Sequence, residues 1–194
     1  YYNGKGELMT DYEWDALFDQ LKRLEEETGE ILPDSPTNRV SEDSIVGKKE
    51  EHEFAALSLA KTKQVSDLVK WAEDRPIWIS WKLDGLTLVV TYDGGILTKI
   101  VTRGNGHIGT NITHLAPAIS GIPATISEKG HLVVRGEAVI SYADFEQFII
   151  ESEGDYANPR NLASGSLALK DIEEVKQRHI QWIPFTLVYT EREL

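Results

Sequence analysis

The chain has 194 residues, of which 41% are hydrophobic and five are tryptophan, so it is long enough for one domain with a small appendage and a sizeable core. The absence of cysteine excludes a disulfide scaffold and a thiolate zinc site, and it fits a cytoplasmic protein. No stretch reaches the roughly 18 apolar residues of a membrane span, so no membrane partner is expected. With a net charge of −12, the chain would need a local basic patch or further domains to grip duplex nucleic acid.

The N-terminal part predicts one long helix. Thr10 and Glu13 have the spacing of a capping box, and apolar side chains follow at helical intervals. Gly29 is typical of a helix end. We therefore expect a helix over about residues 11–27.

A linker is expected to follow this helix. Two prolines in residues 32–37 favour an extended or turning chain, because proline blocks a helix and biases its predecessor toward extended backbone. Residues 38–55 are polar and are expected to be irregular. We place a domain boundary near residue 38, which gives a small helical subdomain at 1–37 and a larger domain at 38–194.

Strands predominate in the larger part. Runs of β-branched and aromatic residues, bounded by turn residues, predict strands at 77–83, 86–92, 96–102, 132–140 and 180–189. Helical patterns predict helices at 65–73, 141–150 and 161–169. Strands with intervening helices predict an α+β fold that is rich in antiparallel sheet.

Lys82 is the first candidate for chemistry, because it ends an apolar stretch and precedes Asp84 and Gly85. In a strand, Lys82 would share a face with Trp78 and Ser80, and this face would line a cleft. Such a lysine can act as a nucleophile if burial or cationic neighbours favour its neutral amine, and it can then hold AMP as a phosphoramidate. The alternatives are a lysine that points into water and an Asp-Gly pair that only forms a turn.

Three further segments carry charged residues beside glycine or small residues. Arg103 opens a glycine-rich loop whose amides could approach a ribose or phosphate, although the loop could also be a simple turn. Glu137 shares a predicted strand face with Arg135, and it could bind a ribose, help to hold Mg²⁺, or merely pair with that arginine. Arg160 could bind phosphate.

In their order, these segments resemble the adenylation domain of NAD-dependent DNA ligases. The motifs are Lys-Leu-Asp-Gly at 82–85, Thr-Arg-Gly-Asn-Gly at 102–106, Arg-Gly-Glu at 135–137 and Ala-Asn-Pro-Arg-Asn at 157–161. The last of them continues as a long match through Gly-Ser-Leu at 165–167, which favours the NAD-dependent branch over the ATP-dependent one.

The resemblance implies a nucleotidyltransferase (ATP-grasp-like ligase) core of antiparallel-rich sheets with helices. A small helical subdomain that binds the nicotinamide mononucleotide (NMN) half of NAD would precede this core. The implied reaction is attack of Lys82 on the α-phosphate of NAD, which forms lysyl-AMP and releases NMN. AMP would then pass to the 5′-phosphate of a nick in double-stranded DNA during replication and repair, with Mg²⁺ neutralising phosphate charge.

The resemblance also assigns site residues, and it assigns none to the metal. The implied catalytic residues are Lys82, Asp84, Arg103 and Glu137. The implied NAD-binding residues are Tyr1, Tyr2, Asp11, Trp14, Asp15, Ser58, Leu59, Ser80, Lys82, Arg103, Glu137 and Arg160. Trp14 stands where the family has tyrosine, and it also fits the apolar stripe of its helix, so simple packing is the alternative for it.

Several positions depart from the family pattern. Ser80 replaces a glutamate, Ala168 an arginine and Asn105 an aspartate, and the later adenylation and DNA-binding motifs are absent from the sequence. We therefore expect a trimmed ligase, one subunit of a split ligase that works with a second chain, or a degenerate relative. The competing function is a non-catalytic ligase-like subunit that binds NAD or a partner chain. An ATP-dependent RNA ligase or capping-type enzyme is opposed by Tyr1-Tyr2 and Asp11.

Overall fold

The computed structural model describes residues 9–30, 32, 35–37, 45, 47–58, 60–152 and 156–192, and for residues 11, 12 and 15 it describes only the backbone. The chain divides into two compact units, residues 1–43 and residues 44–194. Several predictions lie outside the described residues: the boundary near residue 38, Tyr1, Tyr2, Leu59 and the side chains of Asp11 and Asp15.

The first unit contains helix α1 (Asp11–Thr28), which confirms the predicted helix. The Thr10 hydroxyl accepts from the Glu13 amide at 3.3 Å, and the Glu13 carboxylate accepts from the Thr10 amide at 2.8 Å. Gly29 ends the helix in the left-handed conformation, with φ of 70°. The capping box and the glycine therefore set both ends of this helix.

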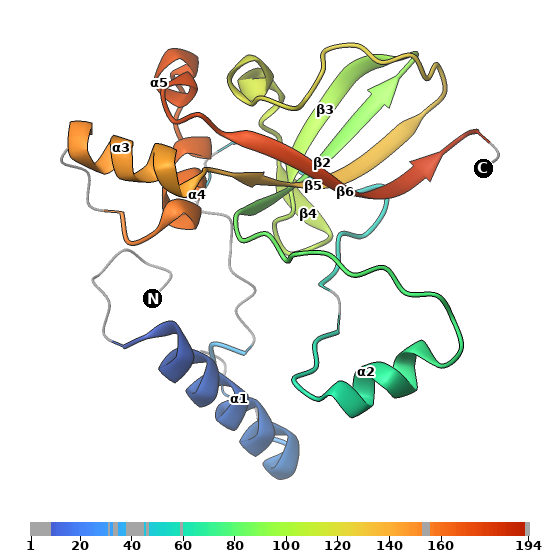
Figure 1. Cartoon of the computed structure of the whole chain (residues 1–194), viewed down its shortest axis with the longest axis vertical. Coiled ribbons are helices and arrows are strands. Elements are labelled where there is room, and N and C mark those ends of the chain that lie inside the picture. The colour runs from blue at the N-terminus through green and yellow to red at the C-terminus, as the bar shows by residue number, and fades with distance from the viewer. Residues whose placement is uncertain are drawn as a thin grey trace. The chain divides into compact units, whose positions relative to one another are not determined.

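The second unit is built on a four-stranded antiparallel sheet in the order β3-β2-β5-β6 (Figure 1). Its strands are β2 (Leu86–Asp93), β3 (Ile96–Thr102), β5 (Leu132–Val139) and β6 (Gln181–Thr190). A second, small sheet pairs β1 (Lys49–Glu51) with β4 (Ile108–Thr110). The helices are α2 (Val65–Ala72), the 3₁₀ helix η1 (Thr113–Ala118), α3 (Tyr142–Ser152), α4 (Pro159–Leu167) and α5 (Ile172–Lys176). The predicted mixture of helices and antiparallel sheet is confirmed.

The two faces of the large sheet differ in chemistry. Leu88, Val90 and Tyr92 of β2 point into the main core, which also takes side chains from η1, α4 and α5. The intervening residues of β2 point to the other face, where the loop at residues 52–58 covers part of the sheet, and Ala56 of this loop packs on Val89. The candidate site lies on this second face. Among the described residues, no helix is long and apolar enough to cross a membrane.

Two sequence predictions about the backbone were wrong. Residues 77–83 form no strand: they follow α2 as a segment without regular secondary structure, in which Trp78 and Trp81 are 96% and 93% exposed. A strand requires a partner, and this segment has none among the described residues. The predicted strand face shared by Ser80 and Lys82 is therefore absent as well. Residues 38–55 are not wholly irregular, because β1 forms there through its pairing with β4.

Candidate active site

The site is built around a row of residues that crosses three strands at one end of the sheet. The Arg103 amide, just after β3, donates to the Thr87 carbonyl of β2 at 2.9 Å. Thr87 faces Glu137 of β5 in the antiparallel ladder, and its hydroxyl donates to the Glu137 carboxylate at 2.8 Å. The fold thus brings Arg103 and Glu137, which the sequence predicted as site residues, to one end of the same sheet.

Glu137 is half-buried, and its electrostatics connect it to the predicted nucleophile. Burial raises the pKa of its carboxyl group. The Thr87 hydrogen bond and the positive charges of Lys82 and Arg160 oppose this rise in pKa. The positive charge of Lys82, whose side chain is exposed, thus favours the ionised form of Glu137.

Gly85 fixes how the chain enters β2. A Cβ atom at this position would lie 2.2 Å from the Ala138 carbonyl oxygen, so the backbone can approach β5 this closely only with glycine. The carboxylate of Asp84, the preceding residue, pairs with the Arg160 guanidinium at 3.2 Å. The Lys-Leu-Asp-Gly and Asn-Pro-Arg-Asn motifs are therefore in contact.

Asn158 explains the position of Arg160. Its side-chain oxygen accepts from the Asn161 amide at 2.9 Å and caps α4. Pro159 occupies the first turn of the helix, where its missing N–H leaves no hydrogen bond unmade. This local structure places Arg160 in the first turn of α4, where it reaches Asp84.

The Asn105 side chain bridges the glycine-rich loop. The Asn105 side-chain oxygen accepts from the amides of His107 and Ile108 at 2.9 and 2.8 Å. Gly104 has φ of 53°, and a Cβ atom there would lie 1.9 Å from the Ile108 carbonyl oxygen. A carboxylate at position 105 could accept the same two hydrogen bonds, so the replacement of the family's aspartate by Asn105 preserves the loop.

The loop at residues 52–58 lies against the same face. Arg103 donates to the Ser58 hydroxyl at 3.2 Å, which brings these two predicted residues together. Arg135 donates to the Ala55 carbonyl at 2.5 Å. Arg135 makes no ion pair with Glu137, so the alternative in which these two residues merely pair with each other is wrong.

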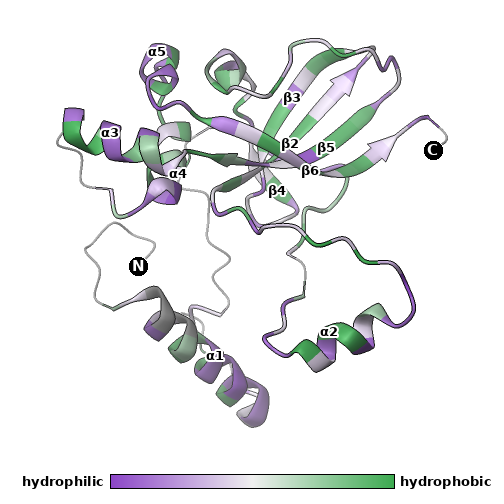
Figure 2. Ribbon diagram, in the orientation of Figure 1, coloured by the Kyte–Doolittle hydropathy of each residue, from purple (hydrophilic) through white to green (hydrophobic). Residues whose placement is uncertain are grey.

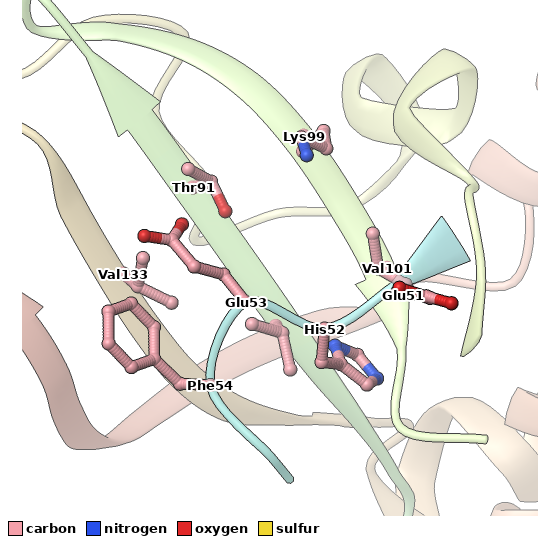
Figure 3. Close-up of a pocket in the computed structure, with 9 residues that line it drawn as sticks. Glu51, His52, Glu53, Phe54, Thr91, Lys99, Val101 and Val133 are labelled. Atoms are coloured by element: carbon pink, nitrogen blue, oxygen red, sulfur yellow. The ribbon is translucent and has the colours of Figure 1, made fainter. Parts of the chain in front are cut away.

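The loop at residues 52–58 also shapes a small pocket, which contains none of the predicted site residues (Figure 3). The pocket is lined by Glu51, His52, Glu53, Phe54, Val89, Thr91, Lys99, Val101 and Val133.

One predicted residue of the second unit is not brought to this row. Ser80 is exposed in the unpaired segment. Trp14 belongs to the first unit, where it stacks on Phe18 with ring centroids 6.4 Å apart, and its role in NAD binding stays a prediction. Thr87 is a site residue that the sequence did not predict. The sequence could have indicated Thr87, because its position in the predicted strand alternates with the residues that face the core.

A half-buried carboxylate that feels the positive charges of a lysine and an arginine, on a sheet end that also carries a glycine-rich loop, is suited to a phosphorylated nucleotide. Comparison with known families agrees with this class. Residues 48–194 match the NAD-dependent DNA ligase adenylation domain. Residues 1–41 match the DNA ligase-like, N-terminal NAD⁺-binding domain. The chain therefore belongs to the family of NAD-dependent DNA ligase adenylation domains, which confirms the resemblance seen in the sequence.

Curated relatives give the same result. The DNA ligase of Lachnoclostridium phytofermentans is 45% identical over 186 residues, which cover 94% of this chain and 28% of that ligase. The DNA ligases of Ruminiclostridium cellulolyticum and Leptospira biflexa are 43% and 40% identical, over 97% and 93% of this chain and 29% and 28% of their own lengths. The chain thus spans less than a third of the relatives that it matches.

Proposed function

We propose that this chain carries out the self-adenylation step of an NAD-dependent DNA ligase. The Lys82 amine, after losing its proton, attacks the α-phosphorus of NAD. A P–N bond forms, the bond from this phosphorus to the bridging oxygen breaks, and NMN leaves with that oxygen and its electron pair. The observation that carries the proposal is the contact between the two motifs, in which the Asp84 carboxylate, two residues after Lys82, pairs with the Arg160 guanidinium at 3.2 Å.

The neighbouring residues have roles that follow from their chemistry. Arg103 and Arg160 supply positive charge for the two phosphates of NAD, and Asp84 orients Arg160 through its ion pair. Glu137, held by Thr87, can accept hydrogen bonds from a ribose. Ser58, which Arg103 contacts, would lie beside the adenosine. Ser80 and Leu59 stay predictions as binding residues.

The two parts of the chain would divide the substrate between them. We propose that residues 38–194 form an adenylation domain with a nucleotidyltransferase core, and that residues 1–37 bind the NMN half. The side chains assigned to this second task are Tyr1, Tyr2, Asp11, Trp14 and Asp15. The match of residues 1–41 to the NAD⁺-binding domain supports this division.

Mg²⁺ fits this site as an ion that the substrate helps to bind. Among the described residues, no group of three or more His, Asp or Glu side chains gathers around a metal position. Glu137 would supply a carboxylate, and phosphate oxygens and water would complete the shell, which is the usual coordination of Mg²⁺. The bound ion would neutralise phosphate charge.

The later steps would also draw on the parts of the ligase that this chain does not span, because it covers 28% and 29% of the lengths of two relatives. AMP would pass from Lys82 to the 5′-phosphate of a nick in double-stranded DNA, and the 3′-hydroxyl would then displace it. Further ligase domains, or a second ligase chain, would grip the DNA, as expected from the net charge of −12. The reaction would take place in the cytoplasm.

The test measures a covalent AMP adduct. The chain is incubated with NAD and Mg²⁺, in parallel with a chimera in which residues 1–194 replace the matched region of the Lachnoclostridium phytofermentans ligase. We expect a mass gain of one AMP from NAD in the chimera, none from ATP, and none in Lys82→Ala.

The competing function is a non-catalytic subunit that holds NAD. Ser80 and Ala168, which replace charged residues of the family, are the observations in its favour. NAD binding by the chimera without any AMP adduct would establish this alternative and overturn the proposal.

A further inference from the structure

The loop at residues 52–58 is joined to the glycine-rich loop after β3 by two backbone hydrogen bonds. The His52 amide donates to the His107 carbonyl at 2.8 Å, and the Ala56 amide donates to the Gly106 carbonyl at 2.7 Å. A Cβ atom on Gly106 would lie 3.3 Å from the Ala56 carbonyl oxygen, so the two backbones also approach each other closely. The position of each loop therefore depends on the other.

The His52 side chain makes a third connection between these loops. Its ring nitrogen Nε2 lies 3.0 Å from the Arg103 carbonyl oxygen. Because a carbonyl oxygen can only accept a hydrogen bond, we assign the proton of the ring to Nε2, which donates it. The ring is partly buried and lines the small pocket with Val89 and Val101, on a sheet with long hydrophobic stretches (Figure 2). A polar N–H group in such surroundings requires an acceptor, and the Arg103 carbonyl supplies it.

The contacts of Arg103 show what this hydrogen bond achieves. Its amide donates to the Thr87 carbonyl of β2, and its guanidinium donates to the Ser58 hydroxyl. Its carbonyl accepts from His52. Because the amide and the carbonyl lie on either side of the Cα atom, holding both of them sets the direction in which the side chain leaves the backbone.

We propose that His52 is a positioning residue for AMP transfer, and that it holds the Arg103 main chain so that the guanidinium faces the phosphates of NAD. This role rests on the proposed function, in which Arg103 supplies positive charge for those phosphates. His52 acts through Arg103 and not on NAD itself. A charge that is already in place stabilises the reacting phosphate better than one that must first be oriented.

Two amide side chains of different length test this role. In His52→Gln the side-chain nitrogen can take up roughly the position of Nε2 and donate to the Arg103 carbonyl, whereas the shorter side chain of His52→Asn cannot reach it. In the chimera defined above, we expect the rate of adduct formation at saturating NAD to fall about 10- to 100-fold in His52→Asn and less than about threefold in His52→Gln. Equal losses in the two variants would overturn the inference.

A double-mutant cycle tests whether His52 acts through Arg103. Once Arg103→Ala has removed the guanidinium, His52→Asn should slow the adduct less than about twofold further, because residues that act as a unit are not additive. Losses that simply multiply would overturn the inference.

His131→Gln is the matched control, because the His131 ring holds Glu53 of the same loop at 2.9 Å and Arg103 is not its partner. It should change the rate less than about twofold, since it leaves the Arg103 main chain in place. A loss as large as that of His52→Asn would show that any anchor of the loop has this effect, and would overturn the inference. Thermal unfolding reports whether each variant is folded.

A spectroscopic measurement tests the hydrogen bond without relying on AMP transfer. Nitrogen NMR of the chain with labelled histidine should show the neutral His52 ring with its proton on Nε2 alone. A proton on Nδ1, or a mixture of the two forms, would overturn the inference.

Binding of NAD separates a failure of this inference from a failure of the proposed function. A folded chimera that forms no adduct would refute the proposed function, and the dissociation constant for NAD is then compared in the same variants. Binding that is at least about threefold weaker in His52→Asn and restored in His52→Gln would leave the positioning role standing. Equal binding in both variants, or no binding by the parent chimera, would overturn it.

Discussion

Asp84 and Arg160 are 76 positions apart in the chain, and their side chains form an ion pair at 3.2 Å. One residue precedes β2 and the other lies in the first turn of α4. Both side chains are substantially exposed, so the pair contributes little to stability. The role of this ion pair is to position the site, because it holds the segment that carries Lys82 next to Arg160, an arginine that is suited to binding phosphate.

Replacing Asp84 separates stability from function. Asp84→Asn should change the free energy of unfolding by less than about 1 kcal/mol, since exposed ion pairs contribute no more than this. It should slow formation of the AMP adduct by about 10- to 100-fold, because Arg160 and the Lys82 segment lose their mutual orientation. Urea unfolding and single-turnover kinetics in the chimera measure the two effects. Glu173→Gln, in the exposed pair with Lys176 at 2.6 Å, is the control, and equal adduct rates in the two variants would contradict the role of Asp84.

Alanine substitutions at two glycines with left-handed backbone separate the effect of steric crowding in the loop after β3 from the effect of backbone strain. Gly94 has φ of 60°, and a Cβ atom there would have no other atom within 4 Å, whereas Gly104 has φ of 53° and a carbonyl oxygen at 1.9 Å from the same position. Gly94→Ala should lower the free energy of unfolding by about 1–2 kcal/mol through backbone strain alone. Gly104→Ala should lower it by about 1–3 kcal/mol more, because the loop must move. Thermal unfolding of both variants checks this, and equal losses would show that the loop is not crowded.

The raised pKa of Glu137 predicts how stability depends on pH. Because burial raises this pKa in the folded state above its ordinary value of 4.5, stability should fall as pH rises from that value through the folded pKa. Glu137→Gln cannot ionise and keeps an acceptor for Thr87. Relative to the parent, it should therefore gain stability between pH 4 and pH 7, while its rate of adduct formation falls. A stability difference that is the same at both pH values in urea unfolding would contradict the assignment.

His131 provides a second dependence on pH, outside the site. Its ring joins Asp93 at 2.5 Å and Glu53 at 2.9 Å, and these hydrogen bonds, that to Asp93 first, raise the pKa of His131. His131 in turn is the main cause of the lowered pKa of Asp93. The contribution of His131 to the free energy of unfolding is complete below its ordinary pKa of 6.5, and it is lost as pH rises through the pKa of His131 in the folded state. The contribution of Asp93 to the free energy of unfolding is present above its ordinary pKa of 3.8, and it is lost as pH falls through the pKa of Asp93 in the folded state.

The stabilisation by His131 should therefore be largest between these limits. We expect His131→Gln to lose about 0.5–1 kcal/mol at pH 5.5 and less at pH 9 in urea unfolding. His179→Gln is the control, because the His179 side chain is 63% exposed against 21% for His131, and it pairs with Asp144 alone. A loss for His131→Gln that does not shrink at pH 9 would show that the ring acts only by packing.

The sequence predicts what depends on local patterns. The capping box at Thr10 and the alternation that leads into the turn at Gly94-Gly95 are local, and the structure confirms the elements that they define. The prediction of a strand at 77–83 was wrong because it does not depend on local patterns alone. The residues favour a strand, but a strand also requires pairing with a segment that is distant in the sequence. The three-residue strands β1 and β4 were missed because such short segments show no periodicity of their own.

The site shows the same division. Lys82, Asp84, Arg103 and Glu137 could be singled out by residue type and motif. Which of them would lie together could not, because the register that sets Thr87 opposite Glu137 joins residues 50 positions apart. That Asn105 can replace the family's aspartate became clear only from the structure, in which its side-chain oxygen accepts hydrogen bonds from two backbone amides.

The central claim is that Lys82 becomes covalently linked to AMP from NAD, and peptide mapping tests it most directly. The chimera is incubated with NAD labelled in its adenylate and with Mg²⁺, then digested, and the labelled peptide is sequenced by mass spectrometry. We predict one labelled peptide, modified at Lys82, with NMN released in equal amount. A label on another lysine such as Lys99, or a folded chimera that binds NAD and carries no label, would contradict the claim.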